Sequence, residues 1–117
     1  MRRKAEAFLF DILGACDDIL SFIGSMDADS YAENNLVRSA VERKCEIIGE
    51  AISQLAKLDP GLAQRISDWR EVIAFRNILI HGYATINHDI VWSVIEDSLP
   101  TLRESVAALL QELSPRE

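Results

Sequence analysis

The stretch YAENNLVRSAVERKCEIIGEAISQLAK, residues 31–57, decides the fold class of this chain. Its apolar residues recur every three or four positions, so they fall on one stripe of a long helix. We expect an interruption near residues 33–35, where a glutamate and two asparagines follow one another, and an end at the Asp-Pro-Gly of residues 59–61. The stripe consists of Leu36, Val37, Ala40, Val41, Ile48, Ala51, Ile52 and Leu55.

The same periodicity continues on both sides of this stretch. Residues 2–25 form one predicted helix, whose apolar stripe consists of Phe8, Ile12, Ala15, Ile19 and Ile23. The acidic segment 26–30 is a turn in which Asp29 and Ser30 are good caps. After a short helical turn at about 61–66, another helix is predicted to begin near residue 69, with Asp68 and Glu71 as a capping box. Its apolar positions are Trp69, Val72, Ile73, Ile78, Leu79 and Ile80.

Gly82 is predicted to end this third helix with a positive φ angle, which glycine adopts without steric cost. Asn87 can cap the last helix, which Pro100 kinks or restarts and which runs to about residue 113. Alternating apolar runs that would indicate strands do not occur. We therefore predict one all-α domain over residues 1–117, an antiparallel helical bundle of four main helices.

Composition limits the function classes. The chain is 49% hydrophobic and 26% charged, which is typical of a soluble globular protein. Its basic N-terminus opens an amphipathic helix rather than a signal peptide, and no apolar run reaches about 18 residues, so we expect a cytoplasmic protein without a membrane span. Cys16 and Cys45 lack the spacing of a zinc site and fit as small core residues. We expect no metal and no cofactor.

The formal net charge of −7 argues against a broad electrostatic surface for RNA or DNA, because an acidic chain repels nucleic acid at long range. A small, locally basic site remains compatible with this charge.

The segment RNILIHGY, residues 76–83, carries the candidate chemistry. Histidine can act as a base or an acid near neutral pH, and arginine presents a planar fork that matches phosphate. Metal-free RNA cleavage needs a base, an acid and a cation. On one helix, however, Arg76 and His81 lie about 140° apart, so they converge only if His81 stands at a frayed helix end or if another protomer supplies a second copy of the helix. A symmetric dimer would place two copies of each in one groove.

A purely structural interpretation of the segment stays open beside this one. The helix dipole favours a histidine in a last turn, and an arginine among apolar residues can pair with a carboxylate such as Glu46 or Glu50. These two glutamates share a helix face, and such pairing suits them better than metal binding. Gly49 and Ala51 beside them are small enough to let another helix approach closely.

The chain resembles HEPN-domain proteins, in particular the HepT-like toxins of bacterial and archaeal toxin–antitoxin pairs. The R-x4-H-x-Y pattern of that family is matched by Arg76, His81 and Tyr83, and its IGEA segment by residues 48–51. Further matches at family-like spacing are Trp69, Val91-Trp92 and Leu99-Pro100. Together these motifs cover most of the chain.

The resemblance implies a homodimer that acts as a metal-independent ribonuclease toxin on RNA such as mRNA or tRNA. Arg76 and His81 would be catalytic, and Asn77 would support Arg76. It also implies a type VII-like partner, an MntA-like minimal nucleotidyltransferase antitoxin, which transfers AMP to Tyr83. An AMP group there would add bulk and negative charge beside His81 and block RNA. The family contains members without nuclease activity, so a non-catalytic nucleotide-binding or adaptor partner of a nucleotidyltransferase is the alternative.

Overall fold

The computed structural model describes residues 2–82 and 86–113, and within these ranges the chain is helical without strands. The prediction of an all-α fold is therefore confirmed. The helices are α1 (Arg2–Ile23), α2 (Ala28–Glu33), α3 (Asn35–Leu58), α4 (Pro60–Ala63), α5 (Trp69–His81), α6 (His88–Asp97) and α7 (Leu99–Leu113).

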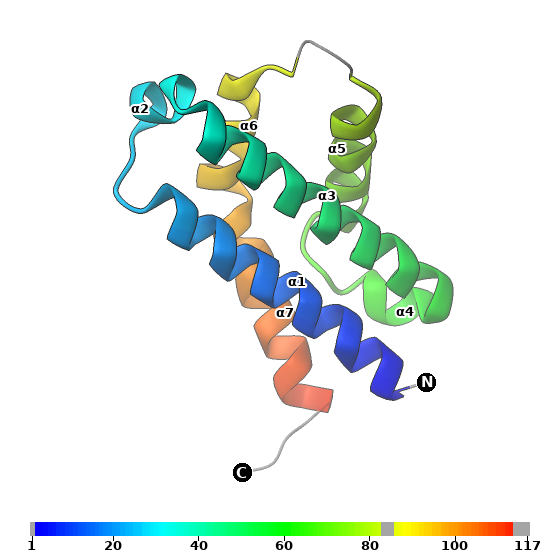
Figure 1. Cartoon of the computed structure of the whole chain (residues 1–117). Coiled ribbons are helices and arrows are strands. Elements are labelled where there is room, and N and C mark those ends of the chain that lie inside the picture. The colour runs from blue at the N-terminus through cyan, green and yellow to red at the C-terminus, as the bar shows by residue number, and fades with distance from the viewer. Residues whose placement is uncertain (1, 83–85, 114–117) are drawn as a thin grey trace.

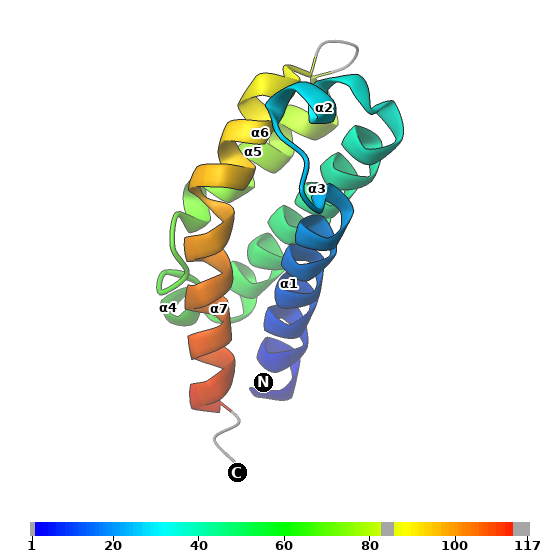
Figure 2. The same ribbon diagram turned by 90° about the vertical axis from the view of Figure 1, so that its left-hand side faces the viewer.

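Helix α3 lies at the centre of the arrangement, between α1 and α5 (Figure 1). α1 and α3 run in opposite directions, and α7 runs antiparallel to α1 on its other side (Figure 2). α6 and α7 follow one another along one edge, separated by a break at Ser98. The bundle therefore consists of four main helical segments: α1, α3, α5 and the consecutive helices α6 and α7. Of the described helices, none has the length and hydrophobicity needed to cross a membrane.

The core forms where the predicted stripes of α1 and α3 face each other and α7. Ile12 and Ile19 of α1 and Ile52 and Leu55 of α3 are fully buried, in line with the prediction. Leu36 is an exception, because 80% of its surface is exposed in the first turn of α3. Both cysteines are buried in this core, as expected for small apolar residues.

Several helix ends follow the predicted chemistry. The interruption in residues 33–35 falls at Asn34, whose side chain accepts a hydrogen bond from the backbone N–H of Val37 at 3.0 Å. Asn87 caps α6 as predicted, accepting from two backbone N–H groups. The cap of α2 is Asp27 rather than Asp29, and Ser30 completes its capping box from the N3 position. The predicted caps were displaced because α2 begins at Ala28, earlier than the predicted second helix.

Two predictions at the ends of α5 are wrong. Asp68 makes no side-chain cap, because its backbone is left-handed, with φ 58°, instead of the extended conformation from which a cap side chain reaches the helix amides. Gly82 has a helical φ of −78° rather than a positive one. It is nevertheless tightly placed, since a Cβ atom there would lie 2.5 Å from the carbonyl oxygen of Ile78. Crowding, not backbone handedness, restricts this position.

Candidate functional site

Arg76 lies at a close contact between α5 and α3. A Cβ atom added at Gly49 of α3 would collide with Cβ of Arg76 and lie 2.7 Å from its Cγ. The expectation that a small residue at position 49 lets another helix approach is confirmed. Because Gly49 has no side chain, α5 can approach α3 closely, and the aliphatic part of the Arg76 side chain lies directly on α3. Only 26% of the Arg76 side chain is exposed.

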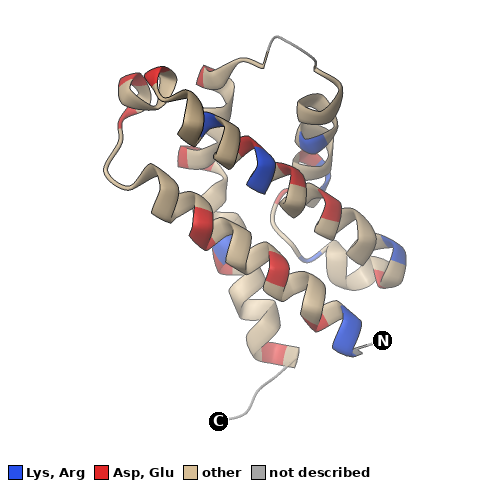
Figure 3. Cartoon of the chain, in the orientation of Figure 1, with Lys and Arg blue, Asp and Glu red and all other residues tan. Residues whose placement is uncertain are grey.

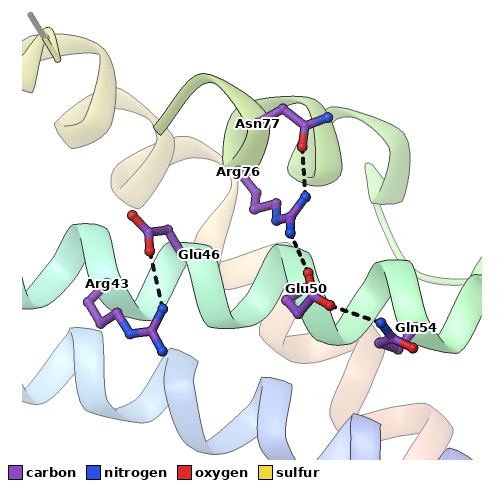
Figure 4. Close-up of polar contacts among 6 residues, drawn as sticks. All are labelled: Arg43, Glu46, Glu50, Gln54, Arg76 and Asn77. Atoms are coloured by element: carbon purple, nitrogen blue, oxygen red, sulfur yellow. Dashed lines mark hydrogen bonds and ion pairs between the residues drawn. The ribbon is translucent and has the colours of Figure 1, made fainter. Parts of the chain in front are cut away.

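The guanidinium of Arg76 is held by two acceptors. One terminal N–H group donates to the carboxylate of Glu50 on α3, and the other donates to Oδ1 of Asn77 at 2.8 Å (Figure 4). Gln54, one helical turn after Glu50, donates to the second oxygen of Glu50 at 2.9 Å. The pairing of an arginine with Glu50 that the sequence suggested is therefore present, and Asn77 contacts Arg76 as predicted.

This network shifts the ionisation of Glu50. The hydrogen bond from Gln54, together with the positive charge of Arg76, lowers the pKa of the Glu50 carboxyl below its ordinary value. The Nε atom of Arg76 is buried and has no hydrogen-bond partner among the described residues. Each terminal nitrogen of the guanidinium carries two N–H groups and uses one of them on Asn77 or Glu50, so the second N–H group of each remains for an incoming oxygen ligand.

His81 does not join this network. It lies exposed in the last turn of α5, and its imidazole makes no hydrogen bond with any described residue. The structure therefore agrees with the helical geometry: one protomer holds Arg76 at the α3 side of α5 and leaves His81 on the outer side. Tyr83, the predicted AMP acceptor, lies outside the described residues.

The outer surface of α5 is more apolar than predicted. Ile78 and Ile80 were expected to pack inside, but 60% and 42% of their surfaces are exposed. Only Leu79 of this trio is buried. The prediction failed because α5 packs mainly against α3, so one side of the helix is covered and the other faces solvent. Ile78 is therefore left mostly exposed, and Ile80 is partly covered.

A cavity of about 400 Å³ opens beside Arg76, between α1, α3 and α5. Its apolar walls come from Phe8, Ile47, Ala51 and Ile80. Its polar lining consists of Asp11, Arg43, Glu46, Glu50, Gln54 and Arg76. Figure 3 shows that acidic and basic positions are mixed along α3 rather than gathered into a basic surface.

A family of ribonucleases matches most of this chain. The model of the family described as "Ribonuclease HepT-like" matches residues 12–109. The chain belongs to the HepT-like ribonuclease family. It is 34% identical over 105 residues to "Putative RNase MJ1380" of Methanocaldococcus jannaschii, with 90% of this chain and 95% of that protein covered.

Other relatives of this HepT-like chain carry similar names. "Putative RNase TTE0752" of Caldanaerobacter subterraneus is 29% identical, with 94% of this chain and 97% of that protein covered. "Probable ribonuclease HepT" of Thermococcus cleftensis is 29% identical, with 88% of this chain and 93% of that protein covered. No solved structure is significantly similar to the chain.

Two other arginines of this HepT-like fold, Arg38 and Arg70, have contacts away from Arg76. Arg38 donates to the backbone carbonyl of Ala32 and to Asn35, which ties α3 to the end of α2. The guanidinium carbon of Arg70 lies 5.1 Å from the ring centre of Trp69. Neither arginine lines the cavity beside Arg76. Among the residues that the structure describes, no three His, Cys, Asp or Glu side chains form a group able to hold a metal ion.

The cavity beside Arg76 in this HepT-like chain was not predicted from the sequence. Part of the signal was available, since Arg43, Glu46, Glu50 and Gln54 follow spacings of three and four and therefore share one face of α3. The contribution of α1, including Phe8, had no local signal. It depends on how α1 and α5 both pack against α3.

Proposed function

We propose that this HepT-like chain is a metal-independent endoribonuclease toxin that works as a homodimer in the cytoplasm. Two copies of the segment 76–83 would face each other across a cleft that takes RNA. Arg76 and His81 are the proposed catalytic residues, and Asn77 supports Arg76. The family membership and the names of the relatives support the ribonuclease class.

The dimer proposal rests on the observation that Arg76 and His81 lie on different sides of α5. Arg76 is fixed on the side toward α3, where Ile80 lines the same cavity, whereas His81 lies exposed on another side of the helix, one turn after the exposed Ile78. One protomer therefore offers one candidate acid–base group, and metal-free cleavage needs two. A second copy packed on the exposed Ile78 and His81 would bring in a second histidine and would also cover apolar surface.

The chemistry follows from the residue types. One His81 removes the proton from a ribose 2′-hydroxyl, whose oxygen attacks the neighbouring phosphorus. Arg76 stabilises the negative charge that develops on the non-bridging oxygens, through N–H groups that Glu50 and Asn77 leave free. The His81 of the other copy gives a proton to the departing 5′-oxygen. The products are a 2′,3′-cyclic phosphate and a free 5′-hydroxyl.

Regulation would act at Tyr83, two positions after His81. We propose that an MntA-like nucleotidyltransferase transfers AMP to the tyrosine hydroxyl. The new phosphodiester carries negative charge, and it would compete with RNA phosphate for Arg76 while its adenosine obstructs the cleft. Co-expression with such a partner should increase the mass of a peptide containing Tyr83 by one or more AMP units. An unmodified peptide would contradict this part of the proposal.

The alternative function is a non-catalytic nucleotide-binding or adaptor partner of a nucleotidyltransferase. One observation favours it: the charge of Arg76 is already offset by Glu50, and a cavity lies beside the pair. In that case Arg76 would hold a nucleotide phosphate without turnover. The purified protein would then bind nucleotides saturably but leave a labelled RNA pool intact.

The decisive experiment is RNA cleavage by the purified protein in the presence of a chelator. His81→Ala should abolish cleavage while the helical content is unchanged. His88→Ala is a matched control, because it removes the other histidine of the chain, at the start of α6, and should leave cleavage intact. Undiminished cleavage by His81→Ala would remove that residue from the mechanism. Sedimentation should show a dimer at micromolar concentration, and a monomer would contradict the two-copy site.

A further inference from the structure

The cavity beside Arg76 has the size and the walls of a small-molecule site. Its volume of about 400 Å³ lies within the range of ligand pockets. The half-buried ring of Phe8 and the side chain of Ile80 provide apolar surface on the α1 and α5 sides. Flat aromatic ligands are held in proteins by such faces, together with a few polar groups at their edges.

The charges around the cavity disfavour a phosphate inside it. Three carboxylates, those of Asp11, Glu46 and Glu50, face two guanidinium groups, so the lining is formally negative by one charge. Arg76 is partly neutralised by Glu50 and stands at the α5 side. A ligand would therefore place a phosphate against the free N–H groups of Arg76 and an uncharged part in the cavity.

Three of the six polar side chains of the lining, those of Asp11, Glu46 and Glu50, are carboxylates, which only accept hydrogen bonds. Arg43 donates to one oxygen of Glu46 at 3.2 Å, which leaves the second oxygen of that carboxylate without a hydrogen bond from any described residue. Gln54 uses its NH₂ group on Glu50, so its carbonyl oxygen remains. Figure 4 shows these side chains in a row along α3, with Arg76 reaching Glu50 from α5. A ligand edge that carries N–H donors fits this row.

We propose that this cavity is a nucleobase subsite that binds guanine, in a nucleotide next to the phosphate that Arg76 contacts. This inference rests on the proposed RNA-cleaving function and specifies its substrate. Guanine is favoured because it presents two adjacent donors, N1–H and the N2 amino group, which one carboxylate such as Glu46 can accept together. Its O6 oxygen can accept from Arg43, the neighbouring donor on the same helix face.

The other bases fit this row of acceptors less well. Adenine and cytosine each offer one amino group beside acceptor atoms. Uracil offers a single N–H between two carbonyl oxygens, which the carboxylates repel. The resulting order is guanine first, adenine and cytosine next, and uracil last.

The first test measures binding without cleavage. Wild-type protein and His81→Ala are titrated with GMP, AMP, CMP and UMP by calorimetry and by NMR, and GMP should bind most tightly in both. IMP, which lacks only the 2-amino group of GMP, should bind more weakly than GMP. Glu46→Gln should weaken GMP binding roughly tenfold, the order expected for loss of a two-point base contact. Equal affinities for the four nucleotides would overturn the assignment.

Glu112→Gln is the matched control for Glu46→Gln. It also removes a glutamate from an exposed pair with an arginine, Arg65–Glu112 at 2.8 Å, but lies on α7 away from the cavity. GMP binding should be unchanged by this variant. An equal loss of GMP binding in both variants would assign the effect to lost charge instead of the cavity, and the subsite would be refuted.

The second test uses cleavage of short RNAs that differ only in the bases next to one position. Wild-type protein should prefer guanine there, and Glu46→Gln should lose the preference without losing all activity. Cleavage that is indifferent to the base in both proteins refutes the subsite and leaves the ribonuclease proposal standing. No cleavage of any RNA, together with selective GMP binding, refutes the ribonuclease and retains the guanine site as a nucleotide site.

Discussion

Replacing Gly49 with alanine tests whether the contact between α3 and α5 sets the position of Arg76. The added Cβ atom would collide with Cβ of Arg76 and lie 2.7 Å from its Cγ. Cβ is attached to the backbone, so a change of rotamer cannot relieve the collision. α5 must move away from α3, and overpacking of this kind costs about 1–3 kcal/mol.

Gly14→Ala is the matched control. Gly14 is an exposed glycine inside α1, and a Cβ atom there would meet nothing within 4 Å. Both substitutions gain about 1 kcal/mol from the higher helix propensity of alanine. Their difference therefore isolates the overpacking at Gly49. Gly14→Ala should be more stable than the wild type, and Gly49→Ala should be less stable than Gly14→Ala by about 1–3 kcal/mol.

The assay is thermal and urea unfolding followed by circular dichroism. For a chain of this length, 1 kcal/mol corresponds to roughly 4 °C in Tm, so the two variants should differ by roughly 4–12 °C. Folded Gly49→Ala should also cleave RNA more slowly than Gly14→Ala, because the guanidinium of Arg76 moves with α5. Equal stability of the two variants would show that α3 and α5 are not spaced by the missing side chain, and the reasoning would be refuted.

Two further predictions follow from ionisation. Burial raises the pKa of the Cys16 and Cys45 thiols to about 12. Neither thiol should therefore react with iodoacetamide at pH 8 until urea unfolds the protein. Fast alkylation of the native protein would contradict the burial. Folding lowers the pKa of the Glu50 carboxyl below its ordinary value of 4.5. The ionised carboxylate therefore stabilises the fold fully above pH 4.5, and this stabilisation is lost as the pH falls through the pKa of Glu50 in the folded protein. Glu50→Gln should therefore have a lower free energy of unfolding than the wild type at pH 7, as measured in urea. This difference should disappear in acid. A difference that does not change with pH would refute the role of the carboxylate.

The sequence predicted those features of the fold that depend on neighbours along one helix. The stripes of α1 and α3, the break at Asn34 and the cap at Asn87 are all local, because they involve residues within about one turn of each other. The pairing of Glu50 with an arginine and the small residue at Gly49 were also foreseeable. A charge or a missing side chain on an otherwise apolar helix face needs a partner from a neighbouring helix.

The wrong prediction for the apolar positions of α5 has a tertiary cause. Its sequence is apolar on more than one side, so periodicity alone does not decide which side is covered. The position of α3 decides it: Leu79 is buried, whereas Ile78 and Ile80 are left exposed. The catalytic roles of Arg76 and His81 and the modification of Tyr83 remain predictions.

The overall charge and the surroundings of Arg76 together limit how this chain can recognise RNA. A net charge of −7 supplies no general attraction to phosphate, and α3 mixes both signs along its length (Figure 3). The charge of Arg76 is itself offset by Glu50. Phosphate contacts can therefore provide only a small part of the affinity. For the proposed ribonuclease, base contacts and the shape of the RNA would provide the rest, and the cavity beside Arg76 combines apolar walls with hydrogen-bond acceptors. An acidic ribonuclease of this design would act on selected sites rather than degrade RNA indiscriminately.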